Sequence, residues 1–364
     1  MTEERDIIRF ALPFAVGIAV TSLVGPLQST FSSICISTSS LVLTAFLMSG
    51  KFRYTPHRIQ LVTVELAACL IGSMCLTAAA IAASSSTGQP SFVAVKASAI
   101  CQSMIRVIDS MPFENAGTGA LIKALLTGNR TSLPSELSEA FRESGASHIL
   151  ALSGMHLGII YGILSKALSP AGNERSIKIL RSTAIVASCG IYTIATGAGE
   201  SMTRAFLFIL LNETARLLNR KTSLKGILAA ALIIQLATDP LSIRSVSFQL
   251  SYAAMAGIAY IHPYLKGFWP SDGKGPFGRI WENASMSISC QITTGPLAWI
   301  HFRSFPQNFL IANLIAIPLT GLIIPVALAA LTLHAAGICP DFIIRLTEFL
   351  VSLITGSLKI IASL

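Results

Sequence analysis

Ser153 and His156 are the residues of this sequence whose types and spacing come closest to a catalytic pair. A serine hydroxyl becomes a nucleophile when a nearby imidazole can take its proton, so this pair could support hydrolysis. Both residues lie in the stretch GASHILALSGMHLGII, residues 145 to 160, which otherwise has the composition of a membrane-crossing helix. Because polar side chains are costly in hydrocarbon, their presence in this stretch needs a specific reason.

Three interpretations of this stretch are open. The first is an intramembrane serine hydrolase, since A-L-S-G is similar to the G-x-S-G motif of rhomboid proteases, whose histidine lies on another helix. Ala151 replaces the first glycine of that motif, and His301 and His334 lie near segment ends, so a deep partner is missing. The second is a packing notch, in which Gly154 lets helices approach while the serine and the histidine bond neighbouring carbonyls. The third is a helix break that lines a conduit.

The composition of the chain is that of an integral membrane protein. Hydrophobic residues make up 52% and charged residues 12% of its 364 residues, and the mean hydropathy is +0.68, outside the range of soluble domains. We predict an all-α polytopic bundle with about 10 to 11 spanning segments of roughly 20 residues each. The apolar runs lie near residues 7 to 24, 31 to 49, 59 to 83, 147 to 165, 182 to 198, 202 to 218, 226 to 238, 246 to 261, 284 to 300, 309 to 333 and 342 to 362.

The basic residues indicate how these segments are oriented. Lysines and arginines cluster at every second connection, which is typical of cytoplasmic loops and explains the net charge of +9 without nucleic acid. The sequence therefore predicts a multi-pass membrane protein with a cytoplasmic N-terminus. The opposite connections carry single arginines: Arg204, Arg244 and Arg303.

The long connection from about residue 84 to 146 is also expected on the outer side. Within it, FVAVKASAICQSMIRVID and LIKALL are predicted to be amphipathic helices, too short to span, that lie along the interface. SLPSELSEAFRESG predicts a further short helix, with Pro134 in its first turn and Gly145 as its stop. This helix leads directly into the stretch with Ser153 and His156.

Glycines and prolines interrupt several spanning segments, and we expect some of these helices to be broken. The interruptions are Gly197 and Gly199, Gly295 and Pro296, and Pro318, Gly321 and Pro325. Ionisable and polar residues within the apolar runs should face the bundle interior or water rather than lipid. For Glu65 and Glu213 we favour a structural role.

The seven cysteines are scattered through apolar runs, without a C-x-x-C pair or a histidine at metal-ligand spacing. They are typical of small core residues. We expect no metal and no cofactor.

Four segments, taken in order, resemble the competence DNA-uptake channel family of the ComEC type, in particular its multispanning competence domain. They are ALLTGNRTSLPSELSEAFRESGASHILALSGMHLGII, ATGAGESMTRAFLFILL, DPLSIRSVSFQLSYAAMAGI and HFRSFPQNFLIANLIAIPLTG, and they begin at residues 124, 195, 239 and 301. The resemblance covers roughly residues 90 to 335. It divides the chain into N-terminal transmembrane helices (1–83), a periplasmic connector (84–112), a competence domain (113–335) and a C-terminal helix (336–364).

The resemblance implies a channel of the bacterial cytoplasmic (inner) membrane that carries single-stranded DNA into the cytoplasm during natural transformation, with no catalytic residues of its own. Sparse arginines would contact phosphates on the outer side, and polar groups would line the deeper path. Loosely spaced contacts suit passage, since tight binding would hold the strand. The candidate path residues are Ser153, Gly154, His156, Arg204, Gln249, Arg303 and Asn313.

Longer members of the resembled family carry an OB-like domain and a metallo-β-lactamase-like domain, and this sequence has neither, nor an H-x-H-x-D signature. Nuclease activity is therefore not expected. A Walker loop is also missing, so energy would come from a cytoplasmic helicase or single-stranded-DNA-binding protein, with a periplasmic DNA-binding protein supplying DNA. Membrane lipid surrounds the chain, and a homo-oligomer is compatible with the sequence. The alternatives are a serine hydrolase using Ser153 and a small-solute transporter on the same fold.

Overall fold

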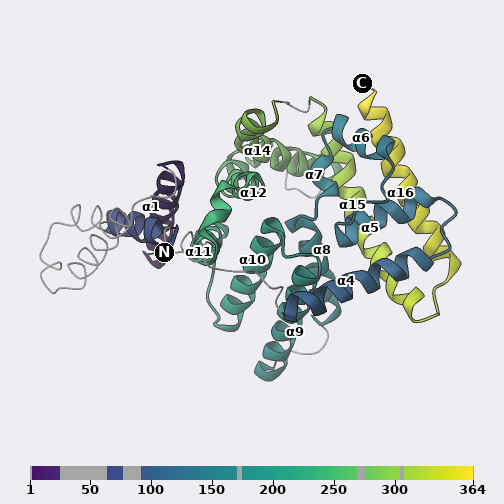
Figure 1. Ribbon diagram of the computed structural model, residues 1–364, viewed down its shortest axis with the longest axis horizontal. Helices are drawn as coiled ribbons and strands as arrows, with labels where there is room; N and C mark the ends of the chain where they lie inside the picture. Colours follow the sequence, from purple (N-terminus) through teal and green to yellow (C-terminus); the bar gives the residue numbers. More distant parts are fainter. Residues whose placement is uncertain are drawn as a thin grey trace, which may run out of the picture. The chain divides into compact units, whose positions relative to one another are not determined.

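A computed structural model gives the fold and describes residues 2–24, 64–76, 92–169, 174–268, 275–303 and 307–363. The predicted helix at 31–49, the basic residues at 51–58 and the stretch SSSTGQPS lie outside the described residues. Every regular element in the described part is helical, which confirms the all-α prediction. The chain divides into two compact units: residues 1–89 with 220–259, and residues 90–219 with 260–364 (Figure 1).

In the part of the first unit that the structure describes, there are five helical elements. They are α1 (Thr2–Val24), the helix Val64–Leu76, α11 (Leu224–Thr238), the short 3-10 helix η3 (Pro240–Arg244) and α12 (Val246–Ala256). Phe14, Leu236 and Phe248 are buried together in its core. Gly17 of α1 lies against the backbone of Cys69, where a Cβ would clash, so glycine permits the two helices to approach closely.

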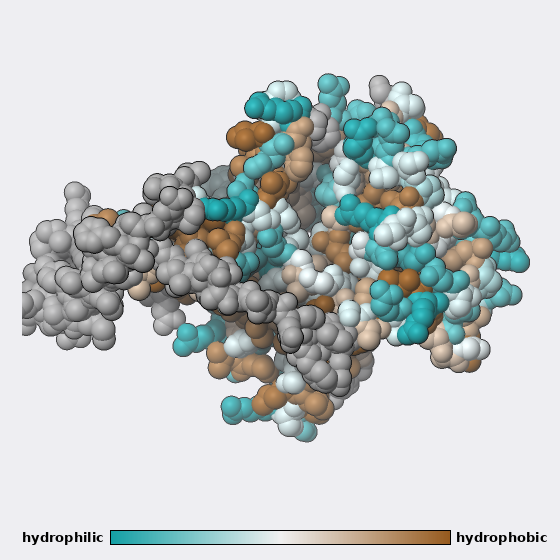
Figure 2. Space-filling model, in the orientation of Figure 1, coloured by the Kyte–Doolittle hydropathy of each residue, from teal (hydrophilic) through white to brown (hydrophobic). Residues whose placement is uncertain are grey.

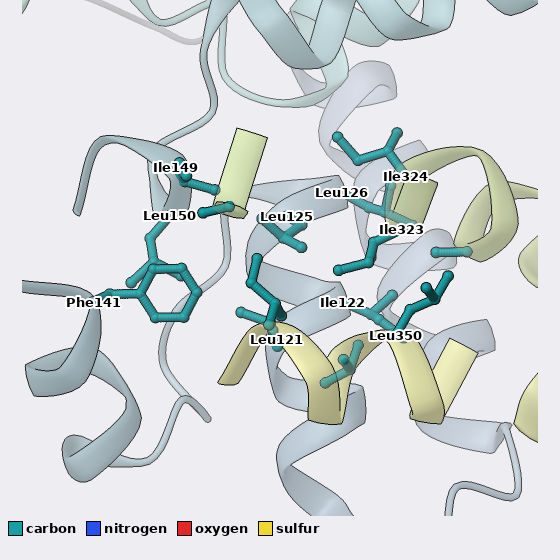
Figure 3. Close-up of a cluster of buried hydrophobic side chains, with 14 of the residues drawn as sticks. Leu121, Ile122, Leu125, Leu126, Phe141, Ile149, Leu150, Ile323, Ile324 and Leu350 are labelled. Carbon is teal, nitrogen blue, oxygen red and sulfur yellow. The ribbon is translucent and has the colours of Figure 1, made fainter. Parts of the chain in front are cut away.

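One part of the second unit is built around a buried helix. It comprises α4 (Phe92–Ser110), α5 (Ala116–Thr127), α6 (Ser135–Glu143), α7 (Ser147–Leu150), α15 (Phe309–Ala335) and α16 (Asp341–Ala362). Side chains from α5, α6, α7, α15 and α16 meet in one apolar cluster (Figure 3). Leu121 and Leu125 of α5, Phe141 of α6 and Ile323 of α15 are each at most 1% exposed, so α5 is enclosed by its neighbours.

The other part of the second unit consists of α8 (Gly154–Ala167), α9 (Arg175–Ala195) and α10 (Glu200–Leu217), with α13 (His262–Lys266) and α14 (Pro276–Phe302). Leu157, Ile185, Met202 and Ile209 form the apolar cluster shared by α8, α9 and α10. A π-helical turn, Gly257–Ile261, precedes α13. The packed helices α8, α9 and α10 position the stretch that contains Ser153 and His156.

The short helix expected at residues 132–145 is confirmed as α6, which begins at Ser135 after Pro134. Gly145 then turns the chain with a φ of +84°, a conformation that favours glycine. The expectation for LIKALL is wrong, because this segment belongs to α5 and eight of the twelve residues of α5 are buried. The ammonium group of Lys123, the one cation in LIKALL, is paired with a carboxylate, since its Nζ lies 2.7 Å from Oδ1 of Asp109 on α4.

The helix breaks expected at the prolines are absent, whereas the break considered for the stretch with Ser153 is present. The helices α14 and α15 continue through Pro296, Pro318 and Pro325, because a proline removes one hydrogen bond and the remaining bonds of a 27-residue helix hold it together. Gly197 (φ +90°) lies in the turn between α9 and α10. The break within an apolar run falls at residues 151–153, between α7 and α8.

Two of the described helices, α9 and α15, are long and apolar enough to cross a membrane. Other apolar helices are shorter, among them α5 and α11. Large apolar side chains are nevertheless exposed along α16, where Phe342, Phe349 and Ile360 are each more than 60% exposed. Figure 2 shows brown, hydrophobic residues exposed among hydrophilic ones on the side of the molecule that it draws. Exposed apolar surface of this kind needs a covering of lipid or protein.

Candidate functional site

Ser153 is the N-cap of α8, and His156 is the third residue of that helix. The backbone N–H of Ser153 donates to Nδ1 of His156 (3.3 Å), and the Ser153 hydroxyl lies 3.0 Å from the same nitrogen. The pair therefore forms a reciprocal cap of the kind in which the third residue of a helix returns to the N-cap. The extended backbone of Ser153 (φ −124°, ψ 167°) makes the break that precedes α8.

This cap determines what His156 can do. Since Nδ1 accepts the backbone N–H of Ser153, the proton of a neutral imidazole sits on Nε2. The His156 side chain is 1% exposed, and its Nε2 has no hydrogen-bond partner among the described residues. A buried donor without an acceptor is rare in folded proteins, which marks His156 as a candidate functional residue.

Gly154 brings α8 into close contact with α10. A Cβ built on Gly154 would lie 3.2 Å from Cβ of Ala205 and 4.0 Å from the carbonyl oxygen of Ser201. Gly158 and Gly162, which follow on α8, have open space around the corresponding position. The packing notch expected from the sequence is therefore located at Gly154, beside the first turns of α10.

Arg204 lies on that same part of α10 and is 5% exposed. One of its terminal nitrogens donates to Oγ of Ser201 at 3.2 Å. The structure thus brings Ser153, Gly154 and His156 against the turn of α10 that carries Arg204. The positive ends of α8 and α10 lie side by side here, which favours negative charge at this place.

A second polar cluster joins α8, α9 and α10 further along. Glu213 is 2% exposed and accepts hydrogen bonds from Tyr161 (2.7 Å), Ser182 (2.7 Å) and Arg216 (2.9 Å). All three donors satisfy one buried carboxylate, which fits the structural role expected for Glu213. The sequence analysis identified none of these donors: the three-residue spacing of Glu213 and Arg216 on one helix could have indicated Arg216, whereas no local pattern points to Tyr161 or Ser182.

Two hydrogen bonds that the sequence did not predict hold the chain in place before the break. Arg130 Nε donates to the carbonyl oxygen of Leu150 at 3.1 Å, and Tyr192 of α9 donates to the carbonyl oxygen of Leu126 at 2.7 Å. Gly128, with a φ of +75°, ends α5 close to the side chain of Leu152. The C-terminal end of α5 therefore lies beside the break that precedes α8.

The remaining candidate residues lie elsewhere. Gln249 belongs to the first unit, where its Nε2 donates to the carbonyl oxygen of Ile243 at 2.9 Å. Arg244, in the same unit, donates to the carbonyl oxygen of Ser22 on α1 at 2.6 Å. Asn313 is on α15, and its side-chain oxygen is buried without a partner among the described residues. Arg303 is exposed and ends α14 in the left-handed conformation, with a φ of +52°.

In the described part of the chain, no group of three or more His, Cys, Asp or Glu side chains could hold a metal ion. The cysteines described there are free thiols.

A family model described as Competence protein matches residues 125–364, which include the break, the cap at Ser153 and all of α10. This chain belongs to the Competence family. Among curated proteins, the uncharacterized protein YcaI of Escherichia coli (strain K12) is 26% identical over 230 residues, which cover 60% of this chain and 29% of YcaI. The ComE operon protein 3 of Bacillus subtilis (strain 168) is 24% identical over 214 residues, covering 58% of this chain and 26% of that protein.

The chain therefore matches less than a third of the length of each of these two relatives. No solved structure shows a significant match. The membership of the Competence family bears out the resemblance seen in the sequence.

Proposed function

We propose that this chain forms a conduit in the bacterial inner membrane through which single-stranded DNA passes into the cytoplasm. One observation carries the proposal: the Competence family match covers the segment in which a broken apolar run packs against a buried arginine. The name of the Bacillus subtilis relative, a protein of the ComE operon, agrees with a role in competence.

The helix break at residues 151–153 would provide the groups that contact DNA in the conduit. The backbone groups freed at residues 151–153, the positive ends of α8 and α10, and the Arg204 guanidinium all favour a passing phosphate. His156 Nε2 adds a donor that is uncommitted among the described residues. A few such contacts along the path would slow the strand little, as passage requires.

We propose a multi-pass topology with a cytoplasmic N-terminus and about ten spanning segments. Arg303 precedes α15 and would lie on the periplasmic side. Ser110 Oγ, at the end of α4, lies 3.2 Å from Nε2 of His334 at the opposite end of α15. In place of a wholly periplasmic connector, we propose that the turn between α4 and α5 reaches the cytoplasmic side and that α5 re-enters the protein.

We assign the chain no covalent chemistry. The Ser153 and His156 side chains are engaged with each other in a helix cap, which accounts for their proximity without catalysis. A periplasmic DNA-binding protein would deliver DNA, and a cytoplasmic helicase or single-stranded-DNA-binding protein would draw it inward.

Reconstitution tests this proposal. Vesicles that contain the chain and an encapsulated single-stranded-DNA-binding protein should take up a labelled single-stranded oligonucleotide into a nuclease-resistant pool, whereas empty vesicles should not. Substitution Arg204→Glu should lower this uptake by at least an order of magnitude, because a carboxylate repels the phosphates. Uptake of free nucleotides or anions without uptake of oligonucleotides would instead favour a small-solute transporter.

A further inference from the structure

The helices α8, α9 and α10 pack against one another, and three of their ends lie together (Figure 1). The carboxylate of Glu213 on α10 bonds Tyr161 of α8 and Ser182 of α9 at one level. Further along α9, a Cβ on Gly190 would lie 3.2 Å from the ring of Phe206, so α9 and α10 are antiparallel. Because α8 begins against the first turns of α10, these two helices are parallel. The C-terminal ends of α8 and α10 therefore lie beside the N-terminal end of α9.

Cations without a carboxylate partner gather at this shared end. Arg216 of α10 is paired with Glu213 at 2.9 Å. Four more cations lie beyond the level of Glu213 and make no ion pair with a described residue: Lys166, Arg175, Lys178 and Arg181. We call these four residues the basic end. Glu174, the N-cap of α9, is the one other carboxylate that α8, α9 and α10 place here, so positive charge is in excess.

Aliphatic side chains are exposed among these cations. Ile179 and Leu180, which follow Lys178 on α9, are 47% and 71% exposed. At the end of α10, Leu217 and Leu218 are 39% and 63% exposed. Cations placed in a cytoplasmic loop for topology alone need only water around them, whereas exposed leucines need an apolar covering. Long basic side chains beside aliphatic ones suit a membrane interface, where the stems contact acyl chains and the charged groups reach the headgroups.

We infer that the basic end binds the phosphate groups of anionic phospholipids in the leaflet where α9 begins. The inference rests on the proposed function in one respect, the passage of α9 across the membrane. Since α9 is long and apolar enough to span, its first two turns would lie at the level of the headgroups. Each cation close to an anionic bilayer surface contributes about five-fold to affinity, so four together can select anionic lipid.

A DNA strand that leaves the conduit is the competing ligand, because it also carries phosphates. Sites for single strands combine cations with aromatic rings on which the bases stack. In the part of this end that the structure describes, the large apolar side chains that are exposed are aliphatic, and the ring of Tyr161 is half-buried and bonded to Glu213. Aliphatic side chains beside cations fit the acyl chains and headgroups of a lipid better than the bases and phosphates of a strand.

The test measures lipid binding by the full chain in a neutral detergent. Phosphatidylglycerol and phosphatidylcholine with identical acyl chains are the probes, and native mass spectrometry gives the dissociation constants of the first bound lipids. Wild type should bind phosphatidylglycerol about ten-fold or more tightly than phosphatidylcholine. Arg175→Gln combined with Lys178→Gln should reduce this ratio to about two-fold or less, because two exposed cations are lost, and should leave the affinity for phosphatidylcholine unchanged.

Two further double variants make the comparison specific. Arg142→Gln combined with Lys266→Gln removes the same formal charge from two exposed cations that already pair with carboxylates, and it should keep the ratio of wild type. Arg175→Lys combined with Lys178→Arg keeps both charges and should also keep the ratio. An unchanged affinity for phosphatidylcholine in every variant shows that the chain is folded.

The outcomes separate the lipid site from the proposed function. If wild type binds neither lipid, the passage of α9 through a membrane fails. If wild type binds both lipids equally, or if the Arg142 and Lys266 variant loses the preference as strongly as the Arg175 and Lys178 variant, the membrane topology stands and the basic end is no lipid site. Loss of oligo-dT affinity in Arg175→Gln with Lys178→Gln, at an unchanged lipid preference, would assign the cations to the DNA strand and overturn the inference.

Discussion

The phenolic oxygen of Tyr161 on α8 lies 2.7 Å from Oε1 of Glu213 on α10 and donates a hydrogen bond to it. One level away along the same two helices, Gly154 lies against Ala205. From the Gly154–Ala205 contact to the Tyr161–Glu213 contact, the residue numbers rise on both helices. The helices α8 and α10 therefore run parallel, and their N-termini lie at the same end. The Tyr161–Glu213 hydrogen bond therefore fixes the position along the helix axes at which the break before α8 meets the first turns of α10.

Removal of the buried carboxylate should loosen this arrangement. We expect Glu213→Ala to lower the free energy of unfolding by about 1–3 kcal/mol, because the Tyr161 and Ser182 hydroxyls lose their acceptor inside the protein. Thermal unfolding of the detergent-solubilised protein measures the effect. Glu139→Gln, which removes one charge of an exposed ion pair on α6, is the matched control and should change little. Equal stabilities of the two variants would show that the network does not hold the helices.

The notch at Gly154 predicts a position-specific steric effect on α8. Gly154→Leu should abolish DNA uptake and destabilise the protein by about 1–3 kcal/mol, because no space is left beside Ala205. Gly158→Leu on the same helix meets no neighbour within 4 Å and should be tolerated. Addition of Ala205→Gly to Gly154→Ala should restore any activity that the single change costs. Comparable loss in the Gly154 and Gly158 variants would contradict the close contact.

Ser153 distinguishes a helix cap from a nucleophile. If the serine only caps α8, Ser153→Ala should cost about 1 kcal/mol of stability and reduce uptake mildly, and Ser153→Asp should restore the cap. A serine hydrolase would lose all its activity in both variants. The measurement is DNA uptake by the two variants alongside hydrolysis of a fluorescent peptide or ester library by the purified protein. Hydrolysis by wild type that disappears in Ser153→Ala would overturn the capping role.

The hydrogen bond between Ser110 and His334 predicts where the turn after α4 lies. A membrane-impermeant maleimide added to intact spheroplasts should leave Ser110→Cys unlabelled, whereas it should label Thr131→Cys, an exposed position between α5 and α6. Both positions should react after the membrane is opened, and the parent chain gives the background from its native thiols. Labelling of Ser110→Cys from the outside would place the whole connector in the periplasm and refute the re-entrant α5.

Much of the helical framework could be predicted from the sequence. The apolar runs near 202–218, 309–333 and 342–362 correspond to α10, α15 and α16, since runs of this length and hydropathy form helices. The helix after Pro134 and the turn at Gly145 followed from local turn chemistry. Ser153, Gly154 and Arg204 were each selected as unusual in an apolar surrounding, and the structure brings them to one place.

Other features depend on tertiary contacts that periodicity cannot show. The helix α5 is enclosed because α15 and α16 surround it, and a short apolar segment gives no indication of whether lipid or protein covers it. Pro296, Pro318 and Pro325 suggested breaks, yet α14 and α15 continue through them, and the structure supports only the break considered at Ser153. The helices α14 and α15 pack against each other, a pairing that no local pattern encodes.

The central claim is that this chain passes DNA across the inner membrane. The most direct test is deletion of the gene in a naturally competent host, with surface-bound and nuclease-resistant internal DNA measured separately from the same labelled sample. We predict that surface binding persists, that internal DNA falls to background, and that the wild-type chain restores it while Arg204→Glu does not. Unchanged internal DNA and unchanged transformation in the deletion strain would contradict the account.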